Sequence, residues 1–68
     1  MTNITNQDIL NGMAKAARGH WNDFLVCSNE APTIAEIHRR RWDQAADACY
    51  SFAAKNGLRV RKGQVGGI

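Results

Sequence analysis

Apolar side chains recur every three or four residues in two separate stretches of this 68-residue chain. This spacing places them on one face of an α-helix, and the positions between them are mostly polar. The sequence therefore predicts one all-α domain with helices over residues 6–26 and 33–56. The first stripe consists of Leu10, Met13, Ala14, Ala17, Trp21, Phe24 and Leu25, and the second of Ile34, Ile37, Trp42, Ala45, Cys49, Phe52 and Ala53.

The first helix is expected to begin near Thr5 or Asn6, whose side chains can accept the free N–H groups of its first turn. Asp8 then lies where the helix dipole favours an anion. Residues 27–32 are interpreted as the connection, because Pro32 disfavours a helical conformation in the residue before it. A connection this short predicts an antiparallel hairpin.

The second helix carries its own end signals. Thr33 and Glu36 have the spacing of a capping box, in which each side chain accepts the other residue's backbone N–H. Asn56 is the expected last residue, since Gly57 can adopt the left-handed conformation that ends a helix. Leu58 can then fold back onto the end of the helix.

A short basic tail follows Gly57. Residues 58–62 alternate between apolar and basic side chains, as a strand or an extended segment does, and the glycines after them disfavour regular structure. The tail could pair with its own copy across a dimer. Alternatively, it could lie over the helices with Leu58 and Val60 turned inward.

Two helices give each other only one contact, so large residues such as Trp21 and Trp42 would leave apolar surface in water. A chain of this size is near the lower limit at which the hydrophobic core of a single chain can stabilise the fold. The sequence therefore predicts a homodimer, or a higher oligomer, with a four-helix core. The expected core and dimer residues are Leu10, Met13, Ala17, Trp21, Phe24, Leu25, Ile34, Ile37, Ala45, Cys49 and Phe52.

Cellular location is inferred from the cysteines and the start of the chain. Cys27 and Cys49 could form at most one disulfide, and residues 1–6 are polar rather than an apolar leader. No apolar run approaches the roughly 20 residues of a membrane span. We expect a reduced, cytoplasmic protein with no membrane contact.

The net charge of +3 is unevenly distributed. Residues 1–32 carry two basic and three acidic side chains, whereas residues 33–68 carry seven basic and three acidic ones. An anionic partner of the second half is therefore considered, either nucleic acid, a nucleotide or an acidic protein surface.

The densest basic cluster is Arg39-Arg40-Arg41. Acidic residues one helical turn away can partly neutralise the first two arginines, which leaves Arg41 unpaired. On a helical wheel Arg41 and His38 fall within the apolar arc, so Arg41 must find an acid, reach solvent along its stem or belong to an interface.

Candidate catalytic or metal-binding groups are few. Neither histidine, His20 nor His38, is interpreted as lying three or four residues from a Cys, Asp or Glu on a shared face in a ligand pattern. Cys27 and Cys49 lack the paired spacing of zinc sites. We therefore expect no metal, no cofactor and no enzymatic activity.

The layout resembles that of small phage-encoded helical-hairpin proteins of the quorum-sensing anti-activator type. The similarity covers residues 1–55: the Met-Thr-Asn start, a first helix ending around a Trp, entry to the second helix through Thr33-Ile34-Ala35-Glu36, and Arg41-Trp42-Asp43-Gln44-Ala45. Those proteins dimerise and block host proteins by direct binding. The resemblance implies a phage-encoded inhibitor acting in the host cytoplasm.

The function expected from the sequence is a protein-binding module that occupies an acidic surface of a larger host protein. Its predicted partner-binding residues are Arg40, Arg41, Trp42 and His38, with Tyr50 in support. The alternative is a nucleic-acid or nucleotide binder that uses Arg59, Arg61 and Lys62 together with Arg41. A purely structural subunit is a third, less favoured hypothesis.

Overall fold

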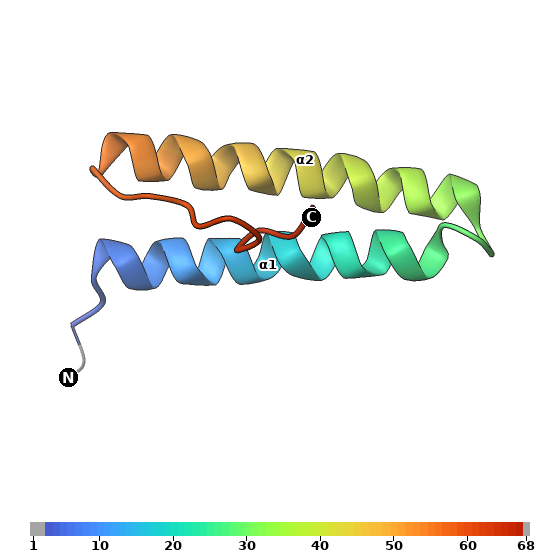
Figure 1. Cartoon of the computed structure of the whole chain (residues 1–68), viewed down its shortest axis with the longest axis horizontal. Coiled ribbons are helices and arrows are strands. Elements are labelled where there is room, and N and C mark those ends of the chain that lie inside the picture. Colours follow the sequence, from blue (N-terminus) through green and yellow to red (C-terminus); the bar gives the residue numbers. More distant parts are fainter. Residues whose placement is uncertain (1–2, 68) are drawn as a thin grey trace.

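Two long helices run antiparallel along the molecule in the computed structural model, which describes residues 3–67 (Figure 1). Helix α1 spans Asn6–Cys27 and helix α2 spans Pro32–Lys55. No strand occurs within residues 3–67, so the predicted all-α hairpin is confirmed. Met1 and Thr2, which belong to the resemblance, and Ile68 lie outside the described residues.

Helix α1 begins as the sequence predicts, with Thr5 as its N-cap. The Asp8 backbone N–H donates to Thr5 Oγ1 at 3.1 Å, and the Thr5 backbone N–H donates to Asp8 Oδ2 at 3.1 Å. These reciprocal bonds form a capping box, which satisfies two N–H groups that helix geometry leaves free. Asp8 therefore contributes a specific hydrogen bond in addition to its charge.

The predicted capping box of Thr33 and Glu36 is wrong. Helix α2 already begins at Pro32, its N-cap is Ala31, and no side chain caps it. Proline suits the first helical position because its φ is already fixed near the helical value. An N–H at this position would have no partner within the helix, so proline loses no hydrogen bond there. Thr33 therefore lies inside the helix rather than before it, and Glu36 instead pairs with Arg40 at 3.6 Å.

The end of α2 follows the expected pattern. Gly57 has a φ of +66°, and the Leu58 backbone N–H donates to the Ala53 carbonyl at 2.8 Å. A Schellman motif has two hydrogen bonds, and this one joins the residues that are farther apart in the sequence. It turns the chain back toward the helices. The helix itself ends at Lys55, one residue earlier than predicted.

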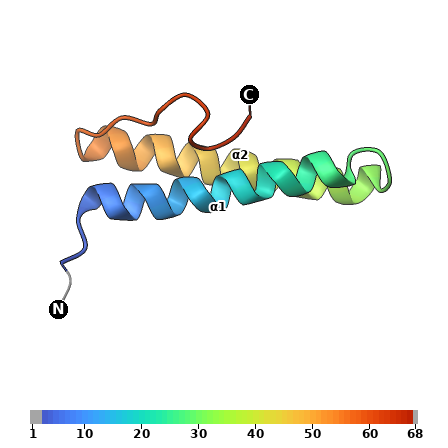
Figure 2. The same ribbon diagram turned by 60° about the horizontal axis from the view of Figure 1, so that its bottom comes forward.

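The tail after Gly57 turns back over the two helices, between which it lies in the view of Figure 1, and stops over the middle of the hairpin. Turning the molecule shows that the tail lies to one side of both helices (Figure 2). Leu58 and Val60 pack against the core, and Val65 is buried. Of the two arrangements considered for the tail, the structure has the one that covers the helices.

The core is small and consists mainly of small side chains. Apart from Leu10, Cys49 and Val65, the buried apolar residues within 3–67 are alanines. Both cysteines are free thiols, and burial raises the pKa of the Cys49 thiol. Neither helix within the described residues is long and apolar enough to cross a membrane.

Candidate functional site

The tail divides the hairpin into two regions. We call residues 3–21 and 42–67 the covered half, because the tail packs on the helices there. Residues 22–41, which lie beyond the end of the tail and include the turn between the helices, form the bare half. The predicted site residues fall differently in these two regions.

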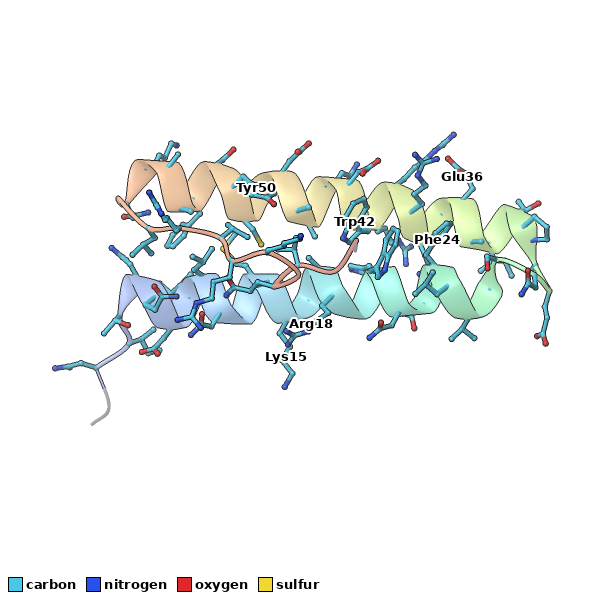
Figure 3. All side chains as sticks on the ribbon, viewed as in Figure 1. Lys15, Arg18, Phe24, Glu36, Trp42 and Tyr50 are labelled. Atoms are coloured by element: carbon cyan, nitrogen blue, oxygen red, sulfur yellow. The ribbon has the colours of Figure 1, made fainter. Side chains whose placement is uncertain are left out.

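A tryptophan pair lies beneath the end of the tail. The rings of Trp21 and Trp42 are 4.8 Å apart between centroids and tilted by 50° to each other. Trp42 Nε1 donates to the Val65 carbonyl at 2.8 Å. This bond uses the only donor of the indole. Trp42, predicted to contact a partner, is thus engaged within the chain itself, as Figure 3 illustrates by its position between the helices.

Two adjacent glycines allow the tail to approach these rings. Gly66 and Gly67 have φ values of +83° and +86°. A Cβ on Gly66 would lie 2.8 Å from Trp21 Cβ, and one on Gly67 would lie 2.5 Å from Trp42 Cζ2. The sequence showed these glycines only as an irregular segment, although they are where the tail docks.

The bare half exposes large apolar side chains. Leu25 is 51% exposed, Val26 73%, Ile34 50% and Ile37 46%. Three of these were expected in the shared core of a dimer, and within one chain they face solvent. By contrast, Leu10, the longest apolar side chain of the core, is fully buried in the covered half.

The predicted partner-binding residues do not share one surface. Arg40 and Arg41 are exposed in the bare half, and Arg40 pairs with Glu36. Within residues 3–67 Arg41 forms no ion pair, and its side chain reaches solvent, which is one of the outcomes considered for it. Tyr50 is exposed on the covered half and lies far along α2 from Glu36, the residue that pairs with Arg40 (Figure 3).

A basic hollow of about 640 Å³ opens between α1 and the tail. Three cationic side chains line it: Arg18, Arg61 and Lys62. Arg18 Nη1 donates to the Gln64 carbonyl at 3.5 Å, at the limit of a hydrogen bond, so the guanidinium remains largely available. Arg59, the third tail residue of the nucleic-acid hypothesis, is exposed and does not line this hollow.

His38 lies beside the other histidine of the chain. The rings of His20 and His38 are 6.4 Å apart, and one ligand atom each of His20, Asp23 and His38 lie within 4.8 Å of one another. The expectation that neither histidine has an acidic neighbour at this spacing is wrong, because His20 and Asp23 are three residues apart and share a face of α1. The contribution of His38 from α2 depends on the packing of the two helices.

Comparison with known proteins gives no relative that would assign a function to these surfaces. No protein-family model matches the sequence, and neither a curated protein nor a solved structure matches the chain.

Proposed function

We propose that this chain is a small protein-binding module that docks its bare half onto a protein surface, beginning with a second copy of itself. The observation that carries the proposal is the exposure of Leu25, Val26, Ile34 and Ile37 beyond the end of the tail. Removing such side chains from water favours association by about 25 cal/mol per Å² of apolar surface. The same tail that shelters the tryptophans leaves these residues uncovered.

Arginines at the border of this surface favour a partner with acidic groups. Arg41 is exposed and forms no ion pair within residues 3–67, and Arg40 has only a solvent-exposed pairing with Glu36. Exposed ion pairs contribute little, so exchanging Glu36 for a partner's carboxylate costs little. The narrower function, a phage-encoded inhibitor acting on a host protein in the cytoplasm, rests on the sequence resemblance.

Self-association is tested by sedimentation velocity at micromolar concentrations. The double variant Leu25→Ser, Ile37→Ser removes apolar surface from the bare half without adding charge, and it should shift the chain toward monomer. Ile9→Ser is the matched control, because Ile9 is 42% exposed but lies in the covered half. A monomeric wild type, or equal weakening by Ile9→Ser, contradicts self-association through the bare half.

Docking on a different protein is tested with the double variant Arg40→Glu, Arg41→Glu in affinity capture from host lysate. We expect the variant to keep its helical circular dichroism and its self-association and to lose the captured protein. The control is Arg59→Glu, an exposed arginine in the tail. Capture that survives the charge reversal excludes this arginine face.

The basic hollow supports one second candidate, a nucleic-acid or nucleotide binder. Arg18, Arg61 and Lys62 face one concave surface, which suits a phosphate group. Binding of labelled DNA and RNA should then fall steeply between about 50 and 200 mM salt, because phosphate contacts release counterions. The double variant Arg61→Gln, Lys62→Gln should reduce this salt dependence, whereas Arg39→Gln should not. Absent or salt-insensitive binding removes this candidate.

A further inference from the structure

Two buried nitrogen atoms lack hydrogen-bond partners where the helices meet. They are Nδ1 of His20 and Nδ1 of His38. Among the buried and half-buried residues of 3–67, these are the only buried side-chain nitrogen or oxygen atoms without a partner. A polar atom shut off from water without a partner is costly, and an ion is one of the few explanations for it. Both orphaned atoms belong to the type of side chain that most commonly binds metals.

A carboxylate lies beside the two rings. Asp23 is exposed, and within residues 3–67 it takes part in no side-chain hydrogen bond and no ion pair, so its oxygens are uncommitted. It follows His20 by one turn of α1, which puts both side chains on the same face of the helix. The ligand atoms of the three residues lie within 4.8 Å of one another.

We propose that His20, Asp23 and His38 bind a transition-metal ion, with Zn²⁺ as the favoured ion. Two imidazole nitrogens and one carboxylate oxygen suit Zn²⁺ better than the oxygen-seeking Ca²⁺ or Mg²⁺. Tetrahedral zinc holds its ligands at about 2.0 to 2.2 Å, hence about 3.4 Å from each other. The separations of up to 4.8 Å between the ligand atoms are therefore close to those of a zinc site, and small side-chain rotations would close the difference.

The site is separate from the tail and from the basic hollow. Tail contacts are made by one face of α1, which carries Asn11, Arg18 and Trp21. His20 lies on an adjacent face of the same helix. A bound ion would link α1 to α2 at the edge of the bare half. Since three protein ligands leave one coordination position open, that position would hold water.

Nearby groups also affect the affinity. Arg41 follows His38 by three residues, and its positive charge disfavours a bound cation. The negative charge of Asp23 offsets this repulsion. Cys27 follows Asp23 by four residues on α1 and is half-buried, so its thiol is a competing zinc ligand. The test therefore has to separate binding by the histidines from binding by this cysteine.

The experiment titrates the metal-free full chain with ZnCl₂ by calorimetry in a buffer that does not chelate zinc. We expect one ion per chain, a higher melting temperature with zinc, and simultaneous shifts of both imidazole ¹⁵N resonances. Asp23→Asn and His38→Gln should each weaken binding at least about tenfold, since even outer-shell changes cost 10- to 100-fold. Cys27→Ser and the carboxylate control Asp43→Asn should bind as the wild type does.

Each alternative result overturns the proposal. The site is excluded if the wild type takes up no zinc, or if Cys27→Ser abolishes binding while Asp23→Asn leaves it intact. If circular dichroism shows that His38→Gln is unfolded, Asp23→Asn decides the question, because Asp23 is exposed. Unchanged imidazole resonances on zinc addition would equally exclude coordination by the histidines.

Discussion

The covered and bare halves belong to one continuous hairpin, yet they bury their apolar side chains very differently. In the covered half the tail adds a third layer, and Leu10 and Cys49 have no exposed surface. In the bare half only two helices pack together, and Leu25 and Ile34 remain half-exposed. A third layer only ten residues long therefore separates a half in which the tail helps to bury large side chains from a half in which Leu25 and Ile34 stay half-exposed.

The comparison also separates two roles for large residues. The rings of Trp21 and Trp42 pack against each other at a tilt of 50°, and the tail covers them, so their role in this structure is internal packing. The isoleucines of the bare half have no such cover. Variants in the two halves should accordingly affect different measurements: stability in the covered half and association in the bare half.

The largest contrast is expected for leucine truncation. Leu10→Ala removes a fully buried side chain and leaves a cavity, which should lower the free energy of unfolding by about 2 to 5 kcal/mol. Leu25→Ala removes a half-exposed side chain and should cost less than about 1 kcal/mol. Urea denaturation at low concentration measures both. Similar losses from the two variants would show that the bare half is also packed.

Docking of the tail is expected to depend on Gly67. Gly67→Ala would drive a methyl group into the Trp42 ring and should cost about 1 to 3 kcal/mol beyond the strain of its positive φ. Gly63→Ala is the matched control, because Gly63 also has a positive φ but has no atom within 4 Å of its Cβ position. It should show only the strain, about 1 to 2 kcal/mol.

The effect of Gly67→Ala on tail docking is measured by the free energy of unfolding and by the protection of the tail from proteolysis. Limited proteolysis after residue 58 should become faster in Gly67→Ala than in Gly63→Ala, with a matching change in tryptophan fluorescence. If the two variants behave alike, the tail end does not pack on Trp42 in solution.

A smaller difference between the covered and bare halves is expected in the reactivity of the two thiols. Cys49 is buried in the covered half and Cys27 is half-buried in the bare half, so an alkylating reagent should label Cys27 much faster. Denaturation in urea should equalise the two rates. Rapid labelling of Cys49 under native conditions would indicate that the covered half opens readily.

The smallest effect concerns alkaline pH. Burial raises the pKa of Cys49 in the folded chain, so the folded state favours the protonated thiol. Unfolded chains lose this proton first, and stability should fall as the pH rises through the range in which an unfolded cysteine titrates. In Cys49→Ala this part of the pH dependence should vanish. A slope that is identical in both chains would exclude Cys49 as its source.

Local patterns predicted most of the hairpin. The apolar stripes, the Thr5 cap and the reversal at Gly57 each depend on neighbouring residues, and the structure agrees with them. The predicted start of α2 is wrong because two local signals compete there. Pro32 at the first helical position overrides the capping box expected at Thr33.

Features that join distant segments were harder to infer. The packing of Gly66 on Trp21 connects positions 45 residues apart in the sequence, and nothing local to either residue indicates it. This packing also revises the expectation that both tryptophans would need a second chain to cover them. The proximity of His20 to His38 likewise depends on the alignment of the two helices, although the His20 and Asp23 spacing was visible in the sequence.

The return of the tail to the middle of the hairpin affects how the protein can be handled. Gly67 ends against the Trp42 ring, beside the surface proposed for docking, while residues 3–5 lie at the opposite end from the turn (Figure 1). An affinity tag or fluorescent label fused after the last residue would therefore crowd that surface. The same label fused ahead of α1 would leave it clear.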